Sequence, residues 1–252
     1  MDKIIHVLIP ARGGSKGIKD KNIINILGKP LISWSIEFSK MSKDVDKVYV
    51  STDSKKIQKV AKNCGAEVPY LRPKNISGDK ALDIEFIKFH LDWLQNNGFD
   101  IPYAIVHLRT TGPGRCISDL EKAIKIIKDD NFLTGLRSVA LSKLTPYKMW
   151  RLNKDNNLTP LIIDESRELH SLPRQDLPRV YWQNGYIDII KPETVINKNS
   201  MVGDNCYGLL TSDEIVDLDY LSDIPSIEKM LNDICDGKIK TLIQEDITRH
   251  SV

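Results

Sequence analysis

Short apolar runs alternate with amphipathic stretches through the first half of the chain. The apolar run over residues 4–9 predicts a buried strand. The helical spacing of Trp34 and Phe38 predicts an amphipathic helix over residues 31–41. Repeated alternation of strands and helices is typical of an α/β protein built on a central sheet.

The same pattern predicts the elements that follow. Strands are expected at residues 46–53, 103–108 and 135–139, and helices at 54–64, 81–97 and 119–129. His90 lies among polar positions of its helix and is expected to be a surface or packing histidine. The alternation stops over residues 142–189, where the turn-rich tip at 153–157 predicts a hairpin that leaves the fold.

A glycine-rich, basic loop follows the first predicted strand. It runs Ala11-Arg12-Gly13-Gly14-Ser15-Lys16-Gly17, with Lys21 and Asn22 shortly after it. Ligands of open α/β sheets bind at the carboxyl ends of strands, and glycines let backbone N–H groups approach an anion closely. The loop is therefore a candidate phosphate cradle, although an ordinary solvated turn is the alternative. Its spacing matches neither the P-loop nor the dinucleotide-binding pattern.

Composition narrows the class of protein. A chain of 252 residues with 41% hydrophobic and 28% charged residues is typical of a soluble globular protein. A net charge of +2 argues against a dedicated nucleic-acid surface. The four cysteines form no C-x-x-C pair and are expected to be reduced. Since we find no signal peptide and no apolar run near the roughly 18 residues of a membrane span, we expect a cytoplasmic protein without a membrane partner.

Several segments resemble one enzyme family. Residues 9–17, followed by Lys21-Asn22 and by Gly28-Lys29-Pro30-Leu31-Ile32, closely resemble the opening of the acylneuraminate cytidylyltransferases (CMP-sialic acid synthetases). Further segments are similar to the patterns RP…L(S/A)xD, RRQDLP, VYRENGAIYI and IDID of that family, at residues 72–79, 171–178, 180–187 and 216–219. The resemblance extends in order from Ile9 to Asp223.

The resemblance implies a three-layer, Rossmann-like nucleotidyltransferase fold in a single domain over residues 1–252. Residues 142–189 would form a small inserted arm that makes a homodimer and contributes to substrate binding. The implied reaction joins CTP to an acidic, nonulosonic (sialic-acid-like) α-keto sugar, giving a CMP-sugar and pyrophosphate with the help of Mg²⁺. We expect no nucleic-acid partner.

The resemblance also implies the residues of the site. Those expected at the nucleotide are Ala11, Arg12, Gly13, Gly14, Ser15, Lys21, Asn22, Arg72 and Ser77. Those expected at the acidic sugar are Arg109, Thr111, Arg174, Gln175 and Asn184. Arg12 and Lys21 would also be catalytic, because they neutralise the charge that grows as pyrophosphate leaves. The tip at residues 52–54 lies beside the nucleotide in the family, but its side chains are equally good as caps of the next helix.

Two arginines compete for the sugar carboxylate. Arg109 stands where the family usually has a Gln that would face the substrate or base, so this chain has an added positive charge at that position. Arg174 lies in the segment that resembles RRQDLP, and an Arg fork suits a carboxylate well. The alternative for Arg174 is a salt bridge between subunits.

The segment Val216-Asp217-Leu218-Asp219 suggests a metal site. Residues two apart in an extended strand face the same side, so both carboxylates would point one way. One or two carboxylates together with substrate phosphates are typical ligands of Mg²⁺. The alternative is a pair of solvent-facing acids, and Asp223 is either a third acid or a helix cap. Neither the number of metal ions nor the general base follows from the sequence.

Other functions stay open at this point. The same transfer to another acidic sugar, such as an octulosonate, or from another nucleotide, is the alternative within enzymes. A catalytically silent nucleotide-binding regulator on the same fold is the alternative outside them. The retained pair Asp217 and Asp219 argues against the silent protein, because binding alone would tolerate losing the metal.

Overall fold

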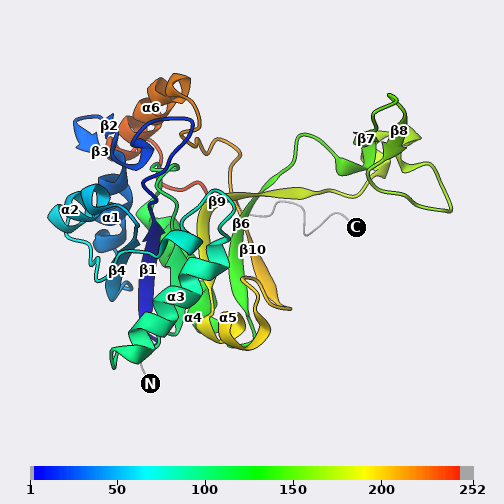
Figure 1. The fold of residues 1–252 in the computed structure, drawn as a ribbon. Helices are drawn as coiled ribbons and strands as arrows, with labels where there is room; N and C mark the ends of the chain where they lie inside the picture. Colours follow the sequence, from blue (N-terminus) through cyan, green and yellow to red (C-terminus); the bar gives the residue numbers. More distant parts are fainter. Residues whose placement is uncertain (1–2, 245–252) are drawn as a thin grey trace.

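A six-stranded sheet forms the centre of the computed structural model, which describes residues 3–244 (Figure 1). Its strands are β1 (Ile5–Pro10), β4 (Lys47–Ser51), β5 (Ala104–His107), β6 (Gly135–Leu141), β9 (Tyr181–Ile190) and β10 (Cys206–Leu210). Their order is β10-β6-β9-β5-β1-β4, and only β9 runs antiparallel to its neighbours within the described sheet.

Strand β1 lies between β4 and β5 and is parallel to both. The carboxyl ends of these three strands, at Pro10, Ser51 and His107, therefore lie at the same edge of the sheet. The chain passes outward from β1 to β4 and then returns across β1 to β5. A reversal of this kind opens a crevice at the carboxyl ends of the strands, which is where ligands bind in doubly wound sheets.

Helices cover both faces of the sheet. The bounds of the helices are α1 (Leu31–Met41), α2 (Lys55–Asn63), α3 (Asp83–Asn96), α4 (Ile117–Asp129), α5 (Pro192–Lys198) and α6 (Ile224–Cys235). Apolar side chains of α1, α2 and α4 share one core cluster with the sheet, whereas those of α3 and α5 share a second cluster on its other face. Helix α6 packs through Ile227 and Leu231 against Ile18 and Leu31. The three-layer α/β fold expected from the sequence is confirmed.

The local predictions agree closely with the observed elements, with two corrections. His90 is fully buried, so its packing role is confirmed but a surface position is wrong. Residues 216–219 do not form a strand, because this segment runs past a loop rather than beside another strand. It is anchored there by the Leu218 N–H, which donates to the Thr111 carbonyl at 2.8 Å. Leu218 is nevertheless buried while Asp219 is exposed, whereas Val216 and Asp217 are both partly exposed.

An arm leaves the sheet between β6 and β9 and projects well beyond it (Figure 1). Its tip is the predicted hairpin, made by β7 (Trp150–Leu152) and β8 (Leu158–Pro160). Strand β9 belongs to the central sheet, so the excursion ends near residue 180 rather than 189. A second small ribbon, β2 (Asn25–Ile26) with β3 (Lys29–Pro30), precedes α1. Among residues 3–244, no helix has the length and apolar character needed to cross a bilayer.

Candidate active site

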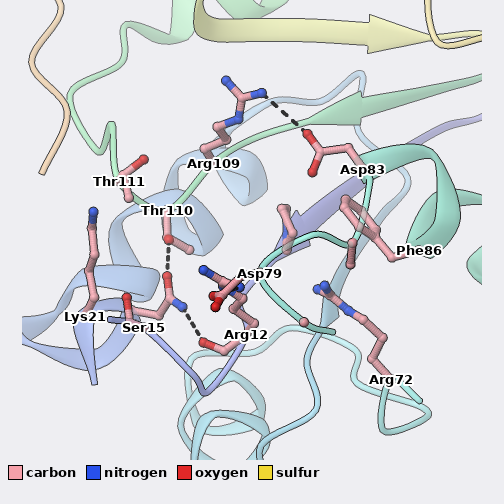
Figure 2. A pocket seen from close by; sticks show the side chains of 14 residues that line it. Arg12, Ser15, Lys21, Arg72, Asp79, Asp83, Phe86, Arg109, Thr110 and Thr111 are labelled. Carbon is pink, nitrogen blue, oxygen red and sulfur yellow. Dashed lines mark hydrogen bonds and ion pairs between the residues drawn. The ribbon is translucent and has the colours of Figure 1, made fainter. Parts of the chain in front are cut away.

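A cavity of about 330 Å³ opens where the loops after β1 and β5 meet the start of α3 (Figure 2). The loop after β1 and the residues that follow it contribute Arg12, Ser15, Lys21 and Asn22, and the loop after β5 contributes Arg109, Thr110 and Thr111. The segment leading into α3 contributes Arg72, Gly78, Asp79, Ala81, Asp83 and Phe86. The cavity thus lies at the edge of the sheet where the topology predicts a ligand.

The glycine-rich loop is held in place from two sides. The Gly13 N–H donates to Asp53 Oδ1 at 2.8 Å, and a Cβ at Gly13 would lie 2.9 Å from the Cβ of Ser54. On the other side, Asn22 Nδ2 donates to the Arg12 carbonyl at 2.9 Å. Glycine is therefore required at position 13 for the close approach of the loop to the tip of β4.

The tip at residues 52–54 was predicted either to lie beside the nucleotide or to cap the next helix, and its residues make two kinds of contact. Ser54 is the N-cap of α2, and its side chain accepts a hydrogen bond from the Ile57 N–H at 3.4 Å. Asp53 instead binds the glycine-rich loop. The tip therefore caps the helix and supports the loop beside the cavity.

Carboxylates already pair with the cations of the loop. Arg12 Nη1 lies 2.7 Å from Asp79 Oδ1, and Lys16 contacts the other oxygen of the same carboxylate. Lys21 Nζ lies 3.2 Å from Asp219 Oδ1. The hydrogen bonds from Lys16 and Arg12 lower the pKa of Asp79 from its usual value, so Asp79 is ionised at neutral pH. The two ion pairs of Asp79 are open to solvent and therefore weak in water, and a polyphosphate that reached the loop would compete with Asp79 for both cations.

Arg72 is a buried cation on the opposite wall. Its Nε donates to Ser51 Oγ at 3.1 Å, and its Nη2 donates to the Ser51 carbonyl. The guanidinium lies over the ring of Phe86, with 4.6 Å between Cζ and the ring centroid. Burial lowers the pKa of Arg72, but arginine keeps its proton at neutral pH. Arg72 thus lines the cavity, and its expected contact with the nucleotide stays a prediction.

Arg109 forms the far wall of the cavity. Its Nη2 lies 3.4 Å from Asp83 Oδ2, at the start of α3. Its Nη1 packs directly against Gly185 of β9, where a Cβ would overlap it. Arg115 is buried and supports the backbone of Arg109. Its Nη2 donates to the Arg109 carbonyl at 2.7 Å, and its Nε donates to the Tyr186 carbonyl at 2.8 Å. Burial lowers the pKa of Arg115 to about 10, so Arg115 is charged and fixes the backbone that carries Arg109.

The structure brings most of the expected residues together. Arg12, Ser15, Lys21, Asn22, Arg72, Arg109 and Thr111 all line the cavity. Ala11, Gly13 and Gly14 belong to the loop beside it. Asp79, Asp83, Phe86 and Thr110 also line the cavity and were not predicted from the sequence, although Asp79 ends the segment that resembles RP…L(S/A)xD.

Other expected residues lie apart from the cavity lining. Ser77 donates its hydroxyl to the Pro73 carbonyl at 2.7 Å. Asn184 is buried, with its Nδ2 donating to Thr211 Oγ1 at 2.7 Å. Arg174 and Gln175 lie in an exposed 3₁₀ turn, Arg174–Asp176, on the arm. Their contacts with substrates stay predictions.

The two candidate metal ligands flank the cavity from one side. Asp219 pairs with Lys21, and Lys21 lines the cavity. Asp217 lies close to Gly112, the residue after Thr111, because a Cβ built on Gly112 would be 2.9 Å from Asp217 Oδ1. Asp223 accepts hydrogen bonds from the N–H groups of Asp219 and Tyr220, at 2.8 and 2.7 Å, so it acts as a local cap. Within the described residues, no group of three or more His, Cys, Asp or Glu side chains is arranged to hold a metal ion by itself.

Known proteins show similarity in sequence and fold. The profile of a family described as Cytidylyltransferase matches residues 6–137. The pseudaminic acid cytidylyltransferase of Campylobacter jejuni is 47% identical over 89 residues, which are 35% of this chain and 38% of that protein. The CMP-N,N'-diacetyllegionaminic acid synthase of Legionella pneumophila is 29% identical over 237 residues, covering 90% of this chain and 96% of that protein.

A solved structure supports the fold. The CMP:2-keto-3-deoxy-manno-octonic acid synthetase complexed with CTP has a TM-score of 0.63 and 14% identity, and the alignment covers 94% of this chain and 100% of that one. This likeness concerns the fold, which is the nucleotidyltransferase fold expected from the sequence. The family match spans more than half of the 252 residues and includes the glycine-rich loop, Arg72 and Arg109. The chain therefore belongs to the cytidylyltransferase family.

Proposed function

We propose that the chain transfers the CMP group of CTP to an acidic nonulosonic sugar and releases pyrophosphate. The anomeric oxygen of the sugar forms a bond to the α-phosphorus, and the bond between that phosphorus and the α,β-bridging oxygen breaks. The observation that carries this proposal is one continuous cavity with the cationic glycine-rich loop at one end and Arg109 at the other. Relatives that are named for pseudaminic and legionaminic acids support the class of acceptor.

The chain's own residues would act mainly by positioning and by charge neutralisation. Backbone N–H groups of Gly14 and Ser15 are suited to the triphosphate, as in other glycine-rich loops. Arg12 and Lys21 would exchange their present carboxylate partners for phosphate oxygens and neutralise the charge of the departing pyrophosphate. Arg72 would contact the nucleotide from the opposite wall.

Asp217 and Asp219 are the proposed ligands of Mg²⁺. Two carboxylates beside a cavity for a triphosphate fit this ion, since Mg²⁺ commonly takes its remaining ligands from substrate phosphates and water. The lack of a three-residue cluster among the described residues is compatible with such a shared site. The chemistry that bound Mg²⁺ supplies is neutralisation of charge on the phosphates.

Arg109 is the proposed ligand of the sugar carboxylate. It lines the same cavity as the loop cations, whereas Arg174 lies on the exposed turn of the arm. A guanidinium can give a carboxylate two parallel charge-assisted hydrogen bonds. The sugar carboxylate would displace Asp83 from its present ion pair with Arg109.

The arm is the proposed dimer contact. It exposes large apolar side chains near its tip, among them Leu152, Leu158 and Ile163, with exposed fractions of 64%, 57% and 71%. Leu152 and Leu158 lie opposite each other in the hairpin, and exposed apolar surface of this kind is typical of an interface. A second copy of the chain is the expected partner, which sedimentation analysis of wild type and Ile163→Asp would test.

The function itself is tested by pyrophosphate release with each of the four nucleoside triphosphates and a panel of nonulosonic and octulosonic acids. We expect release with CTP and a nonulosonic acid. Preference for an octulosonic acid would favour the alternative acceptor, and CTP binding without release would favour a silent regulator. Release with another nucleotide in preference to CTP would contradict the proposal.

A further inference from the structure

Helix α3 contacts the segment that carries Arg72 at two points one helical turn apart. Phe86 packs against the Arg72 guanidinium at 4.6 Å from the ring centroid. His90 shares a hydrogen bond of 2.9 Å between its Nδ1 and the Tyr70 Oη. Residues four apart lie on the same face of a helix, so one face of α3 holds both Tyr70 and Arg72.

The contact between Tyr70 and His90 is enclosed by aromatic rings. The ring of Tyr70 packs edge-on against Phe89, with 4.9 Å between centroids, and lies 5.6 Å from Trp93. His90 is fully buried and lies 4.7 Å from the ring of Tyr49. Burial lowers the pKa of His90 to about 3 and raises the pKa of Tyr70. Both groups are therefore neutral near pH 7, and they share a partly buried hydrogen bond.

Arg72 itself is held by other contacts. Ser51 accepts the hydrogen bonds from Nε and Nη2, and the Arg72 N–H donates to the Thr52 carbonyl at 2.7 Å. These contacts fix Arg72 against β4 and the residue that follows it. Tyr70, two residues earlier in the chain, is held separately against α3 by its hydrogen bond with His90.

We propose that Tyr70 and His90 are positioning residues for Arg72, which they hold in the orientation that meets the nucleotide. Neither of the two lines the cavity, so their effect on the reaction passes through Arg72. The inference rests on the proposed function, in which Arg72 contacts CTP. It assigns a role to a buried histidine that takes no part in the proposed chemistry.

The test begins with Tyr70→Phe, which removes the hydroxyl but keeps the ring. Because a net hydrogen bond is worth about 1 kcal/mol, we expect the Kd for CTP by calorimetry and the KM for CTP to rise about three- to tenfold. The KM for the acceptor should stay within about twofold of wild type. Tyr103→Phe is the matched control: its hydroxyl also makes hydrogen bonds, to Ile127 O and Asn131 Oδ1 at 3.1 Å, away from the cavity.

Two further comparisons separate positioning from stability. In an Arg72→Ala background, Tyr70→Phe should have almost no additional effect on CTP binding, because the residue it acts through is gone. His90→Gln, which can still hydrogen-bond the phenol, should keep more CTP affinity than His90→Leu. An unchanged CTP Kd in Tyr70→Phe, or equal effects of Tyr70→Phe with and without Arg72, would overturn the inference. A wild-type chain that binds CTP but releases no pyrophosphate would instead contradict the proposed function.

Discussion

Gly185 offers a sharp test of the role of Arg109, because the two are in direct contact. Gly185 has φ of +66°, in the left-handed region, and a Cβ there would overlap Arg109 Nη1. The substitution Gly185→Ala should therefore have two separate effects. The backbone strain should lower the free energy of unfolding by about 1–2 kcal/mol. The new methyl group should displace the guanidinium from its present position at the cavity wall.

The kinetic effect follows from the contact that is lost. A hydrogen bond to a charged group is worth about 1.5–3 kcal/mol, so kcat/KM for the acceptor should fall roughly 10- to 150-fold. The KM for CTP should change less than about twofold, because Arg12 and Arg72 lie on other walls of the cavity. Pyrophosphate release, measured at varied acceptor and then at varied CTP, separates the two constants.

Gly98→Ala is the matched control. Gly98 has φ of +75°, and a Cβ there would meet no atom within 4 Å. This variant should lose a similar amount of stability and keep wild-type kinetics. The reasoning would be refuted if Gly185→Ala kept the wild-type acceptor KM, or if it raised the KM for CTP as much as that for the acceptor.

Three further predictions address the metal, the loop and acid stability. Asp219→Asn should abolish Mg²⁺-dependent turnover without lowering the Tm, and pyrophosphate release near the wild-type rate would remove the metal assignment. Arg12→Ala should lower kcat/KM for CTP roughly 10- to 1,000-fold, whereas the control Lys40→Ala, on the far end of α1, should not; equal losses would indicate general destabilisation. Burial lowers the pKa of His6 and His107 to about 4, below the usual 6.5. Their contribution to stability is thus complete above pH 6.5 and lost as the pH falls toward 4, by about 1.4 kcal/mol per pH unit for each histidine. Urea denaturation at pH 7, 6 and 5 would show it, and a free energy of unfolding that did not fall with pH would contradict it.

The elements could be predicted from the sequence because their signals are local. Helix α1 has the predicted bounds, since apolar spacing over residues 31–41 is enough to define it. The place of β9 between β5 and β6 could not be predicted, because strand pairing joins residues far apart in the chain. The burial of His90 was missed for the same reason. Its partner Tyr70 is distant in sequence, and a helical pattern does not report which polar positions find a partner.

In the candidate site, too, the features that are local in the sequence could be predicted and the long-range contacts could not. The cations of the glycine-rich loop could be predicted because they lie close together in the sequence. The carboxylates that pair with them come from elsewhere: Asp79 joins Arg12, and Asp219 joins Lys21. The strand expected at residues 216–219 was wrong because alternating apolar residues also occur where an irregular segment is half buried against a loop.

The transfer of the CMP group is the central claim, and ³¹P NMR follows it directly. The wild-type chain would be mixed with CTP, Mg²⁺ and the acidic sugar that gives the fastest pyrophosphate release. We predict that the CTP resonances decay while pyrophosphate and a new phosphodiester resonance grow in equal amounts. Growth of CMP and pyrophosphate without a phosphodiester would show hydrolysis rather than transfer to a sugar, and would contradict the account.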